Sequence, residues 1–580
     1  METGFKFKID KRQKKENKQF ILSALFIVYC LLSLNAAAQK QPKDSLNPKF
    51  TIDIQGYDPV LSESSKISSE TPAKDTSTAT PPKLDYSIQT KPFDTQYEAA
   101  TIKSVKVLDN KLDKLYHGFL KAGLGNDGTY LGELFLNSTR SKNSETGIHL
   151  LHLSGDPALK DVGDGGFSDN KADLFGKLFL DHSVFTGTMG YTREVVHYYG
   201  FNTNDTLIPA DQIKQLYNVF DLGLDYKSDY LTRAHLDHHF SIKYYNLSDM
   251  FNTSENDFAI DGVVGEDFSG KYGSLHMLLD YSKKMDSNNQ QLLTINSNPS
   301  RNIFTLEPQI KLDQDNFHLT GGLNFTREYN YDAAYHLYPE VHLGLPIAEN
   351  IISIYADVNG YVQKNSYRSF LEENPFINNI VNSLLNTSHK IVFKGGVTGN
   401  FSAATSFEAH FGYDAFNFMP FYINSSLTAT NKFTIVYDNG SVMNIHAEFH
   451  HHPNEKFLFG LKADYYSYMM DNFQKAWQKP LNELTLTGGY NIDDKILASL
   501  DIYSNGNRYA YVAENQSTVT LKGFVDVSLK LEYRYTKILS VFLQLNNLGF
   551  SRYYIWNNYP SERLNVLGGL TYSFWGDKTK

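Results

Sequence analysis

Apolar and polar residues alternate with a period of two in long runs between Leu115 and Phe574. In the last run, one parity is apolar or small and comprises Leu564, Val566, Gly568, Leu570, Tyr572 and Phe574. The other parity is mostly polar or small and comprises Asn565, Gly569, Thr571 and Ser573, with Leu567 as the exception. Because successive side chains of a β-strand point to opposite faces, this alternation predicts strands whose two faces meet different solvents.

Short turn segments divide these runs into hairpins, with one turn in roughly every 44 residues. The turns lie near Ser141, His182, Asp229, Gly270, Gln314, Ala348, Ala404, Asn454, Asp494 and Lys537. About two strands follow each turn and one pair precedes the first, so we predict an all-β fold of about 22 antiparallel strands. A transmembrane barrel of this size has a wide lumen, which normally needs a plug.

The apolar strand faces are predicted to meet lipid. One unbroken run of hairpins is too long for a sandwich, and closure into a barrel satisfies every backbone amide in hydrocarbon. Aromatic residues make up 14% of the chain and gather at predicted strand ends: Tyr198-Tyr199, Tyr465-Tyr466, Tyr535 and Phe574-Trp575. Such side chains favour the lipid–water boundary. The alternative is a large soluble all-β protein such as a propeller.

The N-terminus has the features of a secretory signal peptide. A basic region precedes the apolar stretch from Phe20 to Leu34, and Ala36-Ala37-Ala38 offers a cleavage site before Gln39. An N-terminal membrane anchor is the alternative, but the apolar stretch is short for a spanning helix. We therefore divide the chain into a signal peptide (1–38), an extended segment (39–114), a barrel (115–575) and a tail (576–580).

The segment before the barrel is too short and too polar to form a folded plug domain. Ser62 to Lys83 is rich in Ser, Thr, Pro and Lys, a composition typical of a disordered linker. Something else is then expected to occupy the lumen: this segment, long loops or another protein. In the loop from Ser366 to Ser388, apolar residues at helical spacing follow Asn374-Pro375: Phe376, Ile377, Ile380, Val381 and Leu384. They predict a short helix that either folds inward as a cap or lies on the rim.

Composition excludes several kinds of chemistry. The single cysteine, Cys30, lies inside the predicted signal peptide, so the mature chain has no disulfide, thiol nucleophile or cysteine metal site. The net charge of −10 argues against nucleic acid as a partner. The sequence has no nucleophile elbow, Walker sequence or zincin pair, so we predict neither an enzyme nor a cofactor.

Two stripes of histidine and acidic residues are candidate metal ligands. The first comprises His446, Glu448, His450 and His452, and the second comprises His235, Asp237 and His239. Side chains at i and i+2 of a strand stand about 7 Å apart and can share one metal ion. Both stripes are equally compatible with ordinary polar lumen lining. Further charged residues are predicted to line the lumen and to set selectivity or to form ion pairs: Lys462, Asp464, Lys530, Glu532 and Arg534.

The C-terminal part of the sequence resembles the closing hairpin of TonB-dependent receptors. The resemblance rests on Asn546-Asn547-Leu548, Arg552-Tyr553-Tyr554, Trp556, Tyr559-Pro560, Arg563 and Tyr572-Ser573-Phe574. Two further segments are similar to a plugless branch of that family in Gram-negative bacteria: Leu115 to Gly123, and Gly166 to Asn170. The family resemblance implies energised uptake of large or scarce ligands across the outer membrane. No TonB box is recognisable, because Phe50 to Ile54 matches it poorly.

These observations predict an exported outer-membrane barrel that contacts lipid and mediates the passage or uptake of solutes. The alternative is a structural or assembly subunit of an envelope complex, whose lumen is filled by loops or by a periplasmic or lipoprotein partner. A third alternative is an outer-membrane hydrolase, for which no residue pair stands out. The sequence does not support TonB-coupled transport by this chain alone.

Overall fold

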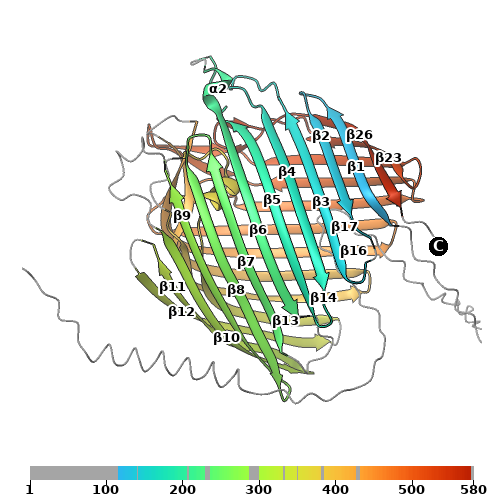
Figure 1. Cartoon of the computed structure of the whole chain (residues 1–580). Helices are drawn as coiled ribbons and strands as arrows, with labels where there is room; N and C mark the ends of the chain where they lie inside the picture. The colour runs from blue at the N-terminus through green and yellow to red at the C-terminus, as the bar shows by residue number, and fades with distance from the viewer. Residues whose placement is uncertain are drawn as a thin grey trace, which may run out of the picture. The chain divides into compact units, whose positions relative to one another are not determined.

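The first and last wall strands pair with each other and close the sheet into a barrel. In the computed structural model, β1 (Tyr116–Gly125) runs antiparallel to β26 (Asn565–Gly576), with Lys121 opposite Thr571. Figure 1 shows the two strands side by side. The structure describes residues 115–139, 141–204, 208–228, 236–286, 300–330, 333–348, 351–379, 384–425 and 431–576.

The remaining wall strands follow one another around the barrel in chain order, each antiparallel to its neighbours. The first half contains β2 (Tyr130–Asn137), β3 (Ser144–Gly155), β4 (Phe167–Phe179), β5 (Ser183–His197), β6 (Lys214–Ser228), β7 (Asp237–Asp249), β8 (Ser254–Phe268), β9 (Lys271–Met285), β10 (Arg301–Gln314) and β11 (Phe317–Tyr329). The second half contains β12 (Ala333–Ala348), β13 (Ile352–Gln363), β14 (Thr387–Ser402), β15 (Thr405–Asn424), β16 (Phe433–Asn454), β17 (Phe457–Met470), β18 (Asn482–Ile492), β19 (Ile496–Asn505), β22 (Phe524–Arg534) and β23 (Leu539–Asn546).

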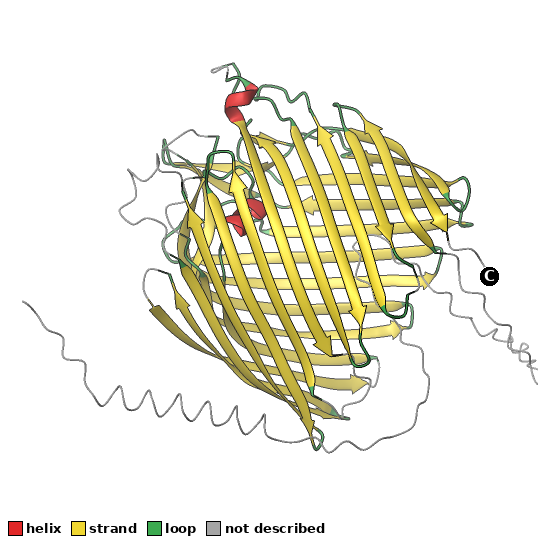
Figure 2. Cartoon of the chain, viewed as in Figure 1, coloured by secondary structure: helices red, strands yellow, loops and turns green. Residues whose placement is uncertain are grey.

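Short elements lie in the longer connections. The hairpin of β20 (Arg508–Val512) and β21 (Ser517–Leu521) interrupts the β19–β22 pair, while β24 (Tyr554–Trp556) pairs with β25 (Tyr559–Pro560). The helices of the described chain are α2 (Ala210–Ile213) and α3 (Tyr367–Glu373), and Figure 2 shows how little of the fold they form. Without β20 and β21, the described sheet is a closed barrel of 22 strands, which confirms the predicted fold class.

Nine of the ten predicted turns fall at connections between consecutive wall strands at one end of the barrel, here called the turn end, and the one near Asp229 lies outside the described residues. The β8–β9 connection, for example, consists of Ser269 and Gly270, both with positive φ. Glycine adopts this left-handed conformation without steric cost, which suits a tight hairpin. The opposite end, here called the loop end, carries the longer connections, such as 364–386 and 547–564.

The two faces of the wall differ as the alternation predicts. On β26, Leu570 is 44% exposed and Tyr572 is 40% exposed, and they share the outer face. Neighbouring strands continue this apolar face, because Leu174 lies opposite Met189, which lies opposite Leu222. A folded protein in water would not expose an apolar band of this kind, whereas the hydrocarbon of a bilayer solvates it.

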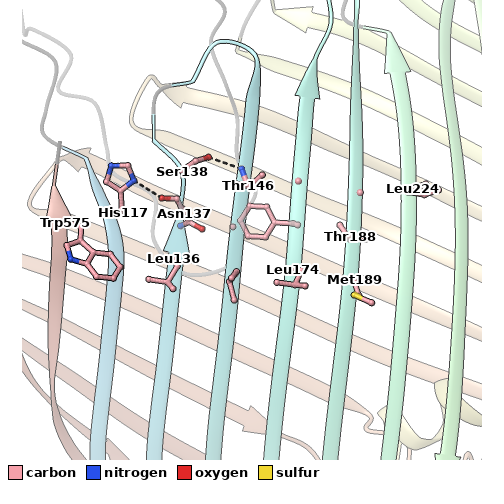
Figure 3. Close-up of a pocket in the computed structure, with 15 residues that line it drawn as sticks. His117, Leu136, Asn137, Ser138, Thr146, Leu174, Thr188, Met189, Leu224 and Trp575 are labelled. Carbon is pink, nitrogen blue, oxygen red and sulfur yellow. Dashed lines mark hydrogen bonds between the residues drawn. The ribbon is translucent and has the colours of Figure 1, made fainter. Parts of the chain in front are cut away.

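A shallow hollow of about 620 Å³ interrupts this outer face near the turn end. Gly176 and Gly187 lie opposite each other there, and a Cβ at either position would have no neighbour closer than 3.7 Å. Figure 3 shows Leu174 and Met189 at its edge, and His117 bonded to the Asn137 carbonyl nearby.

Parts of the predicted domain organisation lie outside the described residues. They are the signal peptide (1–38), the extended segment (39–114) and most of the tail (576–580). Within the described residues, no helix has the length and apolar character needed to cross a membrane.

Candidate functional site

The inner face of the barrel is lined by polar and charged side chains. Lys462 and Asp464 lie on β17 opposite Glu448 and His446, on the face away from exposed Tyr465. The other predicted lumen residues lie on the inner face of β22, whose outer face carries Val525 and Tyr533: Lys530, Glu532 and Arg534. The two groups of charges share the inner face, on strands that are separated by β18 and β19.

His446, Glu448 and His450 of the first histidine stripe share the lumen face of β16, whereas His452 lies at the irregular end of this strand, where its backbone N–H donates to the Ala404 carbonyl. The polar groups of the stripe bond mainly to carboxylates: the His446 Nδ1 is 2.9 Å from an Asp464 oxygen, and the His446 Nε2 is 3.4 Å from a Glu448 oxygen. His450 bonds to the same Glu448. His446 also stacks on His410 of β15, with ring centroids 4.6 Å apart.

The second stripe is described only in part, because His235 lies outside the described residues. Asp237 and His239 share the lumen face of β7, and the His239 Nε2 is 3.2 Å from an Asp225 oxygen. In the described chain, no three His, Cys, Asp or Glu side chains are grouped closely enough to hold a metal ion. Metal binding by either stripe stays a prediction.

The long loop after β13 folds against the inside of the barrel at the loop end. Its helix α3 covers Tyr367 to Glu373 and therefore precedes Pro375, so the position predicted for the helix was wrong. The Ser366 hydroxyl caps α3 by accepting from the Ser369 N–H, and the helix ends at Glu373, with Asn374 as its C-cap before the proline. Ile380 and Val381 lie outside the described residues.

The apolar residues that suggested a helix belong instead to a buried cluster. Ile377 is fully buried and Leu384 is 6% exposed, although the backbone around Ile377 is not helical. We call the whole group the cap cluster, and it comprises Val196, Tyr217, Leu247, Tyr367, Phe370, Leu371, Ile377, Leu384, Tyr422, Phe433 and Tyr559. The described residues of this loop therefore fold inward, as one of the two predicted alternatives has it, and do not lie on the rim.

Aromatic rings from two further connections pack against Tyr559 of the cap cluster. Phe376 stacks on Tyr559 with ring centroids 3.8 Å apart, and Tyr199 meets the edge of Tyr559 at 4.8 Å. The Tyr198 hydroxyl donates to the Ile377 carbonyl at 3.1 Å. Burial raises the pKa of Tyr559 well above its usual range, so this phenol stays neutral.

Buried charges fasten α3 to the wall. The Arg301 guanidinium bonds to Glu255 at 3.1 Å, and both side chains are almost completely buried. Glu255 also accepts from the backbone N–H groups of Tyr367 and Arg368, at 3.0 and 3.3 Å. N–H groups in the first turn of a helix have no acceptor within the helix itself, and the helix dipole favours a carboxylate there.

Other ion pairs extend this attachment around the barrel. Lys364 bonds to Asp257 and Asp280 on neighbouring strands, and Arg368 bonds to Asp221. On the opposite side, the Lys479 Nζ lies 2.6 Å from a Glu373 oxygen. These residues were not predicted, because the sequence does not show which charged residues on separate strands form ion pairs.

A chamber of about 600 Å³ lies between the cap cluster and the closing seam of the barrel. It is lined by aliphatic, aromatic and polar side chains, and the polar ones include Lys121, Asn546, Tyr553 and Arg563. Gly166 and Phe167 also line it, so the three segments that suggested a family resemblance converge on one space. Glu562, at its edge, is half-buried, and burial raises its pKa above the ordinary value.

Comparison with solved structures identifies the architecture. The siderophore receptor PirA from Acinetobacter baumannii superposes with a TM-score of 0.61 at 9% identity, over 80% of this chain and 81% of that one. The FrpB iron transporter from Neisseria meningitidis (F3-3 variant) gives 0.61 at 12%, over 80% and 82%. A mutant ferric enterobactin receptor, PfeA from Pseudomonas aeruginosa, gives 0.59 at 11%, over 79% and 80%. The barrel has the fold of TonB-dependent siderophore receptors.

The predicted resemblance is therefore confirmed for the barrel fold. The sequence matches no protein-family model, and it matches no curated protein. Identities of 9 to 12% establish the fold alone. The plugless character stays a prediction, because residues 39–114 lie outside the described part of the chain.

Proposed function

We propose that this chain is an exported outer-membrane barrel of a Gram-negative bacterium that passes a solute through its lumen. The observation that carries the proposal is the pairing of a lipid-compatible outer face with a charged inner face. In bacterial barrels the short turns face the periplasm and the longer loops face outward. The cap cluster then stands at the outer mouth.

The cap provides the barrier that a wide lumen needs. The long loop after β13 contributes Tyr367, Phe370 and Ile377 to it, and each of these side chains is at most 2% exposed. Buried contacts of this kind hold a loop in one position, whereas release of their ion pairs allows local opening. We therefore propose that solute passage requires displacement of this loop.

Single-channel recording tests the proposal. Purified full-length protein in planar bilayers is expected to give brief, small current steps, and Glu255→Gln is expected to give larger and longer ones. The matched control is Glu372→Gln, which removes an exposed carboxylate on the same helix. Absence of current steps from both the intact protein and Glu255→Gln would argue strongly against passage through the lumen.

A structural or assembly role is the second proposal. It is supported by the cap cluster, which the chain's own residues form inside the loop end, so that a periplasmic or lipoprotein partner would bind at the turn end. Gentle detergent extraction followed by mass analysis is expected to recover such a partner in fixed stoichiometry. Recovery of the barrel alone would count against this role.

A further inference from the structure

The chamber between the cap cluster and the closing seam has the size and lining of a small-molecule site. Its volume of about 600 Å³ falls within the range of ligand pockets, about 300 to 1,000 Å³. Leu131, Leu153 and Leu567 form part of its wall, and Tyr199 and Phe376 add aromatic rings. Ligand pockets are mostly apolar, with a few polar groups that orient the ligand. The polar groups of this chamber therefore indicate what it binds.

Lys121 is a half-buried cation in the wall of the chamber. It lies in the middle of β1 on the inner face, opposite Thr571 of β26. Its ammonium group is 5.2 Å from the centre of the Phe542 ring. Phe542 packs against two facing glycines, Gly123 and Gly569, where an added Cβ would come within 3.1 and 2.6 Å of the ring. The close approach of ring and backbone thus fixes the surface on which the lysine rests.

Lys121 forms no ion pair with any residue that the structure describes. Glu133 lies opposite it on β2, but the Glu133 carboxylate bonds to the His149 Nε2 at 3.2 Å. Two other charges act on Lys121 at longer range, and they are opposite in sign: Lys530 and Glu532 of β22. An ammonium group has three donors and no acceptor. The donors of Lys121 therefore remain available to an anion inside the chamber.

Arg563 is a second cation of the chamber, and it too lacks an acceptor among the described residues. Its side chain is exposed. The chamber also contains two carboxylates, but both already have donors. Asp526 accepts from the Tyr553 hydroxyl. Glu562 accepts from the Asn565 amide at 3.2 Å. The charged groups of the described chamber that have no partner are therefore both cations.

We infer that the chamber binds a small organic anion, a carboxylate or phosphate carried on an apolar or aromatic body. Lys121 binds the anionic group, Arg563 adds positive charge, and the apolar wall holds the body. Charge-assisted hydrogen bonds of this kind are strong, and partial exclusion of water strengthens them further. A cationic ligand would instead have to compete for Asp526 and Glu562 with the donors that they already have. The inference goes beyond the proposed function, because such a ligand can bind whether or not a solute passes through the lumen.

Isothermal titration calorimetry with 1-naphthoate tests the inference. Detergent-solubilised full-length protein is expected to bind this anion saturably. A cation with the same ring system, 1-naphthylmethylamine, is expected to bind at least roughly ten-fold more weakly, because it cannot accept from Lys121. Acetate, which lacks the rings, is also expected to bind at least roughly ten-fold more weakly. No binding of 1-naphthoate, or equal binding of either comparison compound, would overturn the inference.

Three variants place the binding in the chamber. Lys121→Gln is expected to weaken 1-naphthoate binding roughly ten-fold or more, whereas Lys121→Arg keeps the charge and most of the affinity. Leu153→Trp keeps every charge but fills the chamber, and it is expected to abolish binding.

The matched control is Lys243→Gln, which removes an inner-face lysine of β7 that does not line the chamber. Its affinity is expected to equal that of the parent. Circular dichroism melting checks that each variant is folded. Parent-like affinity in Lys121→Gln or Leu153→Trp, or an equal loss in Lys243→Gln, would contradict the assignment. Binding does not require current through the barrel, so this result and the channel recordings are independent.

Discussion

The guanidinium of Arg301 on β10 lies 3.1 Å from the carboxylate of Glu255 on β8, and neither side chain is more than 4% exposed. The same carboxylate accepts two N–H groups of α3. A buried ion pair of this kind contributes little net stability compared with an apolar pair, but loss of one partner leaves an isolated buried charge. The pair therefore fixes where the loop after β13 must lie.

Glu255→Gln is expected to loosen α3 from the wall. The unpaired Arg301 charge costs about 3 to 5 kcal/mol, which corresponds to a roughly 100-fold or greater increase in local opening. Hydrogen exchange of the amides from 367 to 379 measures this change. The control Glu372→Gln breaks an exposed pair with Arg368, worth only about 0.3 to 0.5 kcal/mol. Equal exchange in the two variants would show that Glu255 does not hold the loop.

Tyr559→Ala is expected to destabilise the cap cluster by about 3 to 5 kcal/mol, because it removes a buried ring and leaves a cavity. The side chain is 3% exposed, stacks on Phe376 and donates to the Asn431 carbonyl. Trp556 reports this region, since its ring lies 5.1 Å from that of Tyr422. Its fluorescence, recorded with the other tryptophans replaced, gives the unfolding midpoint. Tyr554→Ala, at a 38% exposed position, is the control and is expected to leave the midpoint nearly unchanged.

Glu562→Gln is expected to stabilise the cap at neutral pH. Burial raises the pKa of Glu562 above its ordinary 4.5, so the folded cap binds this proton more tightly than the unfolded chain does. Stability contributed by Glu562 is then full below the ordinary pKa and falls as pH rises through the raised value. The variant should melt later than the parent at pH 8, with the difference shrinking at pH 4. Glu514→Gln, in an exposed loop, should show no such trend.

Met189→Lys is expected to impair assembly into lipid by about 2 to 4 kcal/mol, because it places a charge on the lipid face near mid-strand. Met189 is 42% exposed on the outer face of β5, and its chain neighbour Thr188 lies on the lumen face. Thr188→Lys is therefore the matched control and is expected to assemble normally. The folded fraction in vesicles, read from heat-modifiable gel mobility, compares the two. Similar yields would contradict the assignment of faces.

The sequence by itself determined the strands, the turns and which residues share the apolar face of the wall. Those features are local, because the period of two fixes the face of each side chain and a short turn fixes the register of its hairpin. This reasoning placed Lys530 and Leu570 on opposite faces of the wall, and the register of the described strands agrees. The helix after Pro375 was misplaced, since burial in an irregular loop also produces apolar spacing that resembles a helix.

Only the tertiary structure decided how the loop after β13 is held inside the loop end. Arg301 and Glu255 are 46 residues apart, and Lys479 and Glu373 are 106 apart, so neither pair is visible in any local pattern. Their contacts exist because barrel closure brings strands from distant parts of the chain around one interior. The alternation of apolar and polar residues is a local property of each strand, whereas these buried ion pairs form only when the whole sheet has closed into a barrel.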